Sequence, residues 1–262
     1  MCICLVAINY HPDYPLILLS NRDESFDRPT LYAHFWNDQT QILAGRDLKD
    51  KGTWLGVSKQ GRIALLTNYR SPDSNDPNKK SRGALVVDFL KNPIAPHNYI
   101  EVLKNTKTLY NGYNLIFGEI RDLYYYNNFF DIWSKLNEKI NVLSNGTLNN
   151  NWPKCKRLKD LFLKNVSNKK ININVLFKIL IDTKSFPDHE LPDTGIGILK
   201  ERFLSPIFII GKDYGTRTST VILFNNKGNI QFIERSYKPG TTEIETEKYY
   251  FFDIKSFAGF NS

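Results

Sequence analysis

The chain opens with two apolar stretches separated by a turn, and this pattern constrains its fold more than any other feature. Residues 2–9 read CICLVAIN and residues 16–21 read LILLSN, which are apolar and partly β-branched runs of strand length. The segment HPDYP at 11–15 lies between them, and its two prolines and aspartate are typical of a turn. The runs therefore predict a β-hairpin in which the numbers of opposite residues sum to about 24, so that Cys2 faces Arg22.

Cys2 becomes the first residue of the mature chain if Met1 is removed, and we expect this removal because cysteine is small. One residue would then carry a thiol and an α-amine, whose ordinary pKa values lie near ~8.5 and ~7.7–8.0. Such a pair supplies a nucleophile together with its own general base. A cysteine that opens a buried strand also packs as a small hydrophobe, so this position alone leaves both interpretations open.

Apolar patterns along the rest of the chain predict further strands and helices. We expect strands over 53–58, 62–68, 113–120, 122–126, 139–144, 206–211, 217–225 and 229–236. We expect helices from an N-cap at Ser81 through residue 92, and over 97–106, 154–166 and 174–181. This order lacks strict βαβ alternation, which favours an α+β fold of mainly antiparallel sheets with helices outside. The length of 262 residues suits one large domain or two small ones, and we expect a single domain over 1–262.

The charge of the chain does not by itself identify a partner. It has 35 basic and 27 acidic residues, a formal net charge of +8. No nucleic-acid-binding motif accompanies this charge, so we expect no nucleic-acid partner. No apolar run is long enough to cross a bilayer and the start lacks the features of a secretory signal, so we expect no integral membrane segment and a cytoplasmic location. The one modest basic cluster falls in a helix-like segment, where we expect a solvated face: Lys154, Lys156, Arg157 and Lys159.

The number and spacing of the cysteines and histidines argue against a disulfide framework and against a zinc site. The three cysteines (Cys2, Cys4 and Cys155) are too few and odd in number for a disulfide framework. The four histidines are scattered and show no zinc spacing, so we expect no metal site and no cofactor required for catalysis. No Cys-x-x-Cys-His attachment exists, but noncovalent haem needs only one axial ligand and no motif, so haem stays open as a ligand.

Short motifs follow one another from the start of the chain to about residue 235. The run Ser20-Asn21-Arg22-Asp23-Glu24 is followed by Phe26-Asp27-Arg28-Pro29. The others are LAGRD at 43–47, GTWLGV at 52–57, LTNYR at 66–70, SRG at 81–83, LSNG at 143–146, LPDTG at 191–195 and YGTRTST at 214–220. This ordered set resembles the NRDE family, also called the Transport and Golgi organisation 2 protein family, over nearly the whole chain.

The NRDE family is in turn similar to the cysteine branch of the N-terminal nucleophile (Ntn) hydrolases, which contains bile-salt hydrolases and penicillin V acylases. This resemblance implies a four-layer αββα sandwich of two mainly antiparallel sheets, with the nucleophile at the start of a central strand. It also implies six active-site residues: Cys2, Arg22, Asp23, Asn68, Asn145 and Arg217. In the hydrolases the early arginine and aspartate are separated by two residues, whereas Arg22 and Asp23 are adjacent.

Each of these residue types has a place in amide hydrolysis. The Cys2 thiolate would attack the carbonyl carbon, Arg22 would lower the pKa of the thiol, and Asp23 would hold the α-ammonium. The side-chain amides of Asn68 and Asn145 suit an oxyanion hole, where one donor contributes about 10²–10³ in rate. Arginine and aspartate also form surface ion pairs, and asparagine is common in turns, so each residue has a structural alternative.

Two functions stay open. The first is a thiol-dependent hydrolase of a small amide (C–N) bond, an N-terminal-cysteine amidohydrolase whose partner is a small-molecule amide. The alternative is a non-catalytic protein that binds and carries haem or another hydrophobic metabolite, such as a lipid or acyl compound. The resemblance implies this alternative because family members are associated with haem trafficking and lipid metabolism. None of these patterns predicts an oligomeric state.

Overall fold

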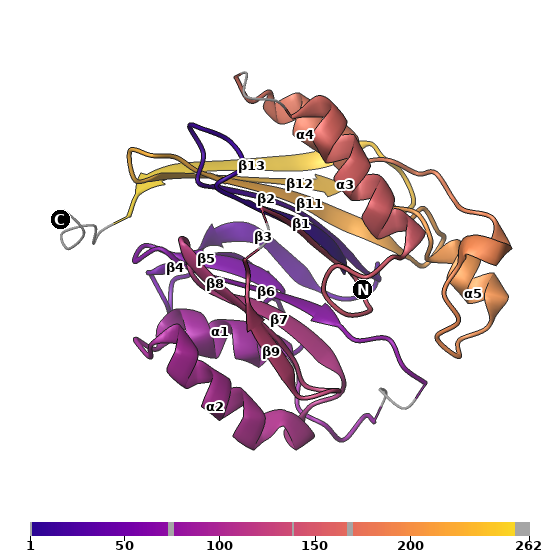
Figure 1. Cartoon of the computed structure of the whole chain (residues 1–262), viewed down its shortest axis with the longest axis horizontal. Helices are drawn as coiled ribbons and strands as arrows, with labels where there is room; N and C mark the ends of the chain where they lie inside the picture. The colour runs from indigo at the N-terminus through magenta and orange to yellow at the C-terminus, as the bar shows by residue number, and fades with distance from the viewer. Residues whose placement is uncertain (1, 73–75, 138, 167–169, 255–262) are drawn as a thin grey trace.

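Two β-sheets are stacked face to face, and each carries helices on its outer side, so the chain forms four layers (Figure 1). The computed structural model describes residues 2–72, 76–137, 139–166 and 170–254. Every strand pairing recorded between the named strands is antiparallel. The predicted αββα sandwich of antiparallel sheets is therefore confirmed.

The first sheet runs in the order β10 (Ile140–Leu143), β1 (Cys2–Ile8), β2 (Leu16–Ser25), β11 (Tyr214–Phe224), β12 (Asn229–Tyr237) and β13 (Ile244–Asp253). The second runs in the order β3 (Thr30–Phe35), β4 (Ile42–Asp47), β5 (Leu55–Ser58), β6 (Arg62–Asn68), β7 (Tyr113–Glu119), β8 (Asp122–Asn127) and β9 (Ile132–Lys135). The helices are α1 (Gly83–Lys91), α2 (Pro96–Thr106), α3 (Pro153–Asn165), α4 (Ile173–Leu180) and α5 (Ile198–Phe203). Helices α3 and α4 cover the first sheet, and α1 and α2 cover the second (Figure 1).

Three apolar clusters fill the three interfaces between the four layers. Cys4, Leu18 and Leu65 belong to the cluster between the two sheets. A second cluster joins the first sheet to α3 and α4, and a third joins the second sheet to α1 and α2. Because the strands at each interface alternate their side chains, residues of one strand contribute to two different clusters.

The predicted hairpin and its register are confirmed. Strands β1 and β2 pair antiparallel with Cys2 opposite Arg22 and Ile8 opposite Leu16. Strand β1 lies inside its sheet, between β10 and β2. Cys4 faces the second sheet, and Cys2 shares that side because strand side chains alternate. The start of this interior strand therefore points its thiol into the space between the two sheets.

Most of the expected elements are observed within a few residues, and the 206–211 strand is the clear exception. This segment is irregular: the Phe208 N–H donates to the carbonyl of Asp182, and the carbonyl of Ile207 accepts from the side chain of Asn21. Its polar backbone groups are thus satisfied outside a strand ladder. Strands β3, β4, β9 and β13 and the short helix α5 were not expected from the sequence. Helix α1 has Arg82, not Ser81, at its N-cap position.

Two further predictions are tested by burial and helix length. Lys154 was expected on a solvated face, but it is only 3% exposed because it lies in the first turn of α3, against the segment that follows α5. Within the described ranges, no helix is long and apolar enough to span a membrane.

Candidate active site

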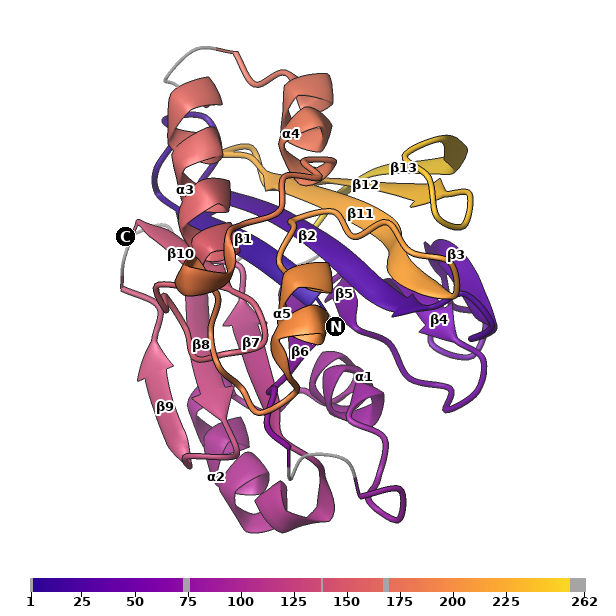
Figure 2. The ribbon, with the colours of Figure 1, turned by 90° about the vertical axis from the view of Figure 1, so that its right-hand side faces the viewer.

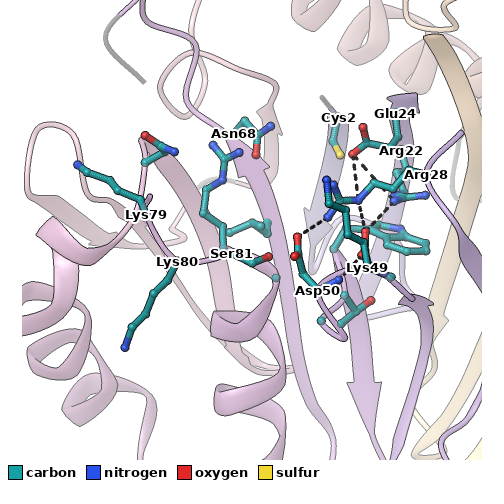
Figure 3. Close-up of a pocket in the computed structure, with 18 of the residues that line it drawn as sticks. Cys2, Arg22, Glu24, Arg28, Lys49, Asp50, Asn68, Lys79, Lys80 and Ser81 are labelled. Carbon is teal, nitrogen blue, oxygen red and sulfur yellow. Dashed lines mark hydrogen bonds and ion pairs between the residues drawn. The ribbon is translucent and has the colours of Figure 1, made fainter. Parts of the chain in front are cut away.

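A pocket of about 410 Å³ opens at the start of β1, between the two sheets (Figure 3). Its lining comes from both sheets, from the loop between β4 and β5 and from the segment that leads into α1. The described residues that line it are Cys2, Arg22, Asp23, Glu24, Arg28, Asp47, Lys49, Asp50, Gly52, Thr53, Trp54, Leu66, Asn68, Asp76, Pro77, Lys79, Lys80, Ser81, Arg82, Gly83 and Asn111. Four of the six predicted site residues are in this set: Cys2, Arg22, Asp23 and Asn68.

Cys2 and Arg22 lie side by side across the hairpin. Cys2 is 8% exposed and Arg22 is 4% exposed, so the thiol has only a small opening to solvent. Burial raises the pKa of the Cys2 thiol, while the Arg22 guanidinium and a hydrogen bond from the Asp23 backbone N–H lower it. Arg22 acts in the predicted direction, but burial outweighs it. The predicted effect of Arg22 is therefore confirmed in direction, although burial leaves the pKa of the thiol above its ordinary value.

The Arg22 side chain is held in place by a stacked ring and an acidic neighbour. Its guanidinium carbon lies 4.1 Å from the centroid of the Trp54 ring, a distance typical of cation–π contacts. Its nitrogens reach the hydroxyl of Thr30 at 3.1 Å and the carboxylate of Asp47 at 3.4 Å. Gly45 makes room for this ring, since a Cβ there would lie 2.3 Å from a ring carbon of Trp54. The LAGRD and GTWLGV motifs thus serve to fix the arginine beside the thiol.

Asp23 turns its side chain to the other side of β2, toward the helices. Its carboxylate accepts a 2.6 Å hydrogen bond from the hydroxyl of Thr216, and its carbonyl accepts one from the hydroxyl of Tyr214 at 3.1 Å. Burial raises the pKa of this carboxyl, whereas the Lys154 ammonium and the Thr216 hydrogen bond oppose the rise. Adjacent residues on a strand face opposite ways, so Arg22 and Asp23 reach the start of β1 from two sides.

Asn68 and Asn145 are in contact, but only Asn68 is among the described residues that line the pocket. Asn68 ends β6 and lies across the pocket from Arg22 (Figure 3). The Asn145 side-chain nitrogen donates to the Asn68 carbonyl at 2.9 Å, and the Ser144 hydroxyl donates to the carbonyl of Cys2 at 3.1 Å. The LSNG segment therefore joins the end of β6 to the start of β1.

Arg217 lies outside the pocket lining, at the point where β11 departs from regular pairing with β2. The register shifts between Thr216 and Thr218, which leaves Arg217 at the irregularity. Its guanidinium donates to the carbonyl of Ser25 at 3.1 Å and to that of Arg28. Arg217 thus holds the turn that carries Arg28, and it is not among the described residues lining the pocket.

The structure adds charged residues that the sequence analysis did not name as site residues. Arg28 pairs with Asp47 and with Asp50, the latter at 2.5 Å. Arg82, at the start of α1, lines the same pocket as the thiol. Three of these charged residues belong to motifs already noted in the sequence: Arg28 to FDRP, Asp47 to LAGRD and Arg82 to SRG. The motifs could therefore have identified them as site residues.

A close backbone approach explains two of the glycines in these motifs. A Cβ on Gly52 would lie 2.6 Å from the backbone of Gly83, and the Thr53 N–H donates to the Gly83 carbonyl at 3.3 Å. The loop before β5 can therefore lie directly against the start of α1 only because Gly52 has no side chain. This contact brings Arg82 and Trp54 to the same pocket.

The three cysteines form no disulfide bond with one another. Cys2, Cys4 and Cys155 are all free and buried. In the part of the chain that the structure describes, no group of three or more His, Cys, Asp or Glu side chains is arranged to hold a metal ion.

Comparison with solved structures agrees with the layered architecture. Two structures of mutant forms of conjugated bile acid hydrolase from Clostridium perfringens are similar to this chain, with TM-scores of 0.52 and 0.51. They cover 97% and 99% of this chain, and the matches cover 92% and 100% of their own chains. Sequence identity is 12% and 11%, so the likeness concerns the fold alone.

Comparison of sequences gives the family. Residues 1–239 match the family described as Transport and Golgi organisation 2. The Transport and Golgi organization 2 homolog of Mus musculus is 32% identical over 272 residues, covering 95% of this chain and 98% of the mouse protein. The Homo sapiens homolog is 33% identical over 256 residues, covering 89% of this chain and 92% of the human protein. The chain therefore belongs to the Transport and Golgi organisation 2 family.

Proposed function

We propose that the chain is a thiol-dependent hydrolase of a small polar amide, with Cys2 as its N-terminal nucleophile. One observation carries this proposal: Cys2 opens an interior strand and lines a pocket of about 410 Å³, with Arg22 directly opposite it. A pocket of this volume is within the range of small-molecule sites. The other two cysteines lie in apolar clusters, Cys4 between the sheets and Cys155 on the buried face of α3.

In the proposed reaction the α-amine of processed Cys2 accepts the thiol proton, and the thiolate attacks the amide carbonyl carbon. The new C–S bond forms, the C–N bond breaks, and the α-ammonium returns the proton to the departing amine. Water then cleaves the thioester, which releases the carboxylic acid and restores the thiol. Because burial raises the pKa of the thiol, formation of the thiolate needs a base beside it, which the α-amine supplies in this proposal.

The polar neighbours have distinct roles in this proposal. Arg22 stabilises the thiolate, and Asp23 holds the α-ammonium from the helix side of β2. Asn68 is the donor for the developing oxyanion, since it is the predicted asparagine that lines the pocket. Asn145 and Arg217 act as positioning residues, because they bond to the backbone of Asn68 and to that of the turn before β3.

The lining supports a polar substrate more than a haem or lipid ligand. Six basic and five acidic side chains are among the described residues around the pocket. Trp54, Leu66 and Pro77 are the larger apolar residues among them, and Arg22 is stacked on the Trp54 ring. Haem needs apolar walls on both of its faces, which this set of residues does not offer.

The test uses protein isolated from cells, in which intact mass establishes whether Met1 is absent. A panel of N-acyl amides is screened for release of free amine by wild type, Cys2→Ala and a matched Cys155→Ala control. We expect turnover by wild type and by the control, and none by Cys2→Ala. Retention of Met1 would leave Cys2 without its amine base and would count against the proposal.

Parallel titration with haem separates the enzyme from a carrier. If binding and chemistry share the pocket, Cys2→Ala leaves ligand affinity within about tenfold of wild type, or ~1.4 kcal/mol. If Cys2 is instead an axial ligand of haem, the substitution shifts the Soret band and weakens binding. Tight haem binding with no turnover of any amide would refute the hydrolase and favour the carrier.

A further inference from the structure

Arg82 is a cation of the pocket lining for which the proposed reaction has no role. It lies at the N-cap position of α1, is partly buried, and donates a 3.1 Å hydrogen bond from Nη1 to the carbonyl of Gly112. Within the described ranges, the ion pairs of the pocket residues involve Arg22 and Arg28 and leave Arg82 without a carboxylate partner. Its guanidinium therefore keeps the donors at Nε and Nη2 for another molecule.

The lining around the thiol, by contrast, has balanced charge. Apart from Asp23, which faces the helices, it contains three cations and three carboxylates: Arg22, Arg28, Lys49, Glu24, Asp47 and Asp50. Asp47 accepts hydrogen bonds from both Arg22 and Arg28, and Asp50 pairs with Arg28 at 2.5 Å. An anionic group of a substrate therefore gains little charge stabilisation on this side of the pocket.

The wall that leads into α1 carries an excess of positive charge. It contributes Lys79, Lys80 and Arg82 to the lining, against one carboxylate, that of Asp76. The Asp76 carboxylate accepts a 2.9 Å hydrogen bond from the N–H of Asn78, within its own loop. Both lysines are exposed, so their ammonium groups remain hydrated, whereas Arg82 is partly withdrawn from water. Arg82 is therefore the cation of this wall that is best placed to bind an anion inside the pocket.

This wall and the thiol lie on different sides of the same pocket. Figure 3 shows Ser81, the neighbour of Arg82, apart from Cys2. The start of β1 and the segment 76–82 both lie at the end of the sandwich that faces the viewer in Figure 2. The close backbone contact between the loop before β5 and the start of α1 fixes the wall in place. A small molecule that reaches Arg82 can therefore lie in the same pocket as the thiol.

The partial burial of Arg82 favours an anionic partner. Burial lowers the pKa of its guanidinium, but an arginine stays charged at neutral pH. A charge that has lost part of its hydration is stabilised when an opposite charge binds to it. Hydrogen bonds between ionised groups are also stronger than neutral ones, and a guanidinium matches a carboxylate with two parallel bonds.

We propose that Arg82 is a specificity-determining residue, which binds a carboxylate of the substrate while the amide carbonyl lies at Cys2. The substrates are therefore small amides that carry a carboxylate in addition to the bond that is cleaved. This inference rests on the proposed function for the reaction, and it adds the chemical class of the substrate. The pocket volume of about 410 Å³ suits a molecule that contains both groups.

The main experiment compares amides that differ only in charge. The probes are N-acetyl-β-alanine, with a carboxylate on the amine side, and N-methylsuccinamate, with a carboxylate on the acyl side. Each is compared with its neutral primary carboxamide, and kcat/KM is measured for the amide bond that the two members share. Wild type should prefer at least one carboxylate over its neutral partner by about ten- to a hundredfold, the usual effect of a hydrogen bond to a charged group. Equal values for both pairs would overturn the proposal.

Substitution of Arg82 tests whether this residue is the origin of the preference. Arg82→Gln should abolish the preference through KM and leave turnover of the neutral partner unchanged. Arg82→Lys should keep part of it, because lysine retains the charge but not the planar fork. The matched control is Lys91→Gln, which removes a positive charge from the exposed last turn of the same helix and should keep the wild-type preference. A preference that persists in Arg82→Gln would overturn the proposal.

A binding measurement depends neither on turnover nor on the folding of Arg82→Gln. The Nε–H resonance of Arg82 is followed by NMR in arginine-labelled Cys2→Ala protein and assigned with Arg82→Lys. Titration with the carboxylate probes should shift this resonance to saturation, and the neutral partners should not shift it. A resonance that neither carboxylate shifts would overturn the proposal. A saturable shift without hydrolysis of any amide would refute the proposed function and retain Arg82 as the carboxylate site.

Discussion

Replacement of Glu234 by glutamine should stabilise the protein at neutral and alkaline pH but not at low pH. Glu234 lies on β12, is 1% exposed, and accepts a 2.7 Å hydrogen bond from the Ala33 N–H of β3. The pairing of β3 with β4 is irregular between Leu31 and His34, and the carboxyl takes up the N–H at that irregularity. Glutamine keeps an oxygen in this position but carries no charge, so Glu234→Gln isolates the effect of ionisation.

The size of the effect follows from the titration of this carboxyl. Burial raises the pKa of Glu234 from 4.5 to about 7. Between these two values the folded state binds more protons than the unfolded state, so the wild-type free energy of unfolding falls as pH rises from 4.5 to about 7. At about 1.36 kcal/mol for each pH unit, the full loss is roughly 3 kcal/mol. Glu234→Gln avoids this loss, so the difference in free energy of unfolding between the variant and wild type should be near zero at pH 4.5.

Urea unfolding at pH 4.5 and pH 8 measures this difference. The matched control is Glu247→Gln on the adjacent strand β13, whose carboxylate forms an ion pair with Arg235 near the surface. Its effect should stay below about 1 kcal/mol at both pH values. If Glu234→Gln and wild type lose or gain stability in parallel between the two pH values, the carboxyl titrates normally and the argument fails.

Two further substitutions test the buried charges and the thiol. Arg70→Met should lower the free energy of unfolding in urea by about 3–5 kcal/mol, because it removes the cation from the buried pair with Glu201. Arg202→Met breaks the exposed pair with Asp188 and should lower it by less than about 1 kcal/mol. Equal losses would contradict the argument that burial makes the Arg70–Glu201 pair important. Alkylation of folded protein at neutral pH should label Cys2 before Cys155, whose thiol pKa is raised by burial to about 12, and Arg22→Met should slow the labelling of Cys2. An unchanged rate would show that the guanidinium does not stabilise the thiolate.

The sequence predicted the fold where local pattern and burial coincide. The β1–β2 hairpin has an apolar core face and a proline-rich turn, so its register could be derived before the structure. Strand β13 was missed because it is an edge strand with alternating exposed and half-buried side chains and many polar residues. The 206–211 segment was misassigned because its apolar residues are buried in a loop, and apolar composition alone does not distinguish a buried loop from a buried strand.

Part of the candidate site could also be predicted from the sequence. Cys2 and Arg22 follow from strand register, and Asn68 follows from the family resemblance. The burial of Lys154 could not be predicted, because its ammonium bonds to Leu204, which follows α5 in a distant part of the chain. Charge on a helix usually indicates a solvated face, and only tertiary packing reverses this expectation.

The neighbouring positions of Arg22 and Asp23 give the first hairpin a way to reject a misaligned partner. A slip of β2 by one residue against β1 would exchange the two sides of the strand. The carboxylate would then lie beside the thiol, and the guanidinium would be buried against Lys154 and Arg70. The second arrangement buries like charges together and the first separates the carboxylate from the cations that now surround it, so both disfavour the wrong alignment. The pair therefore favours the observed register of β1 and β2, independently of any chemistry performed at the site.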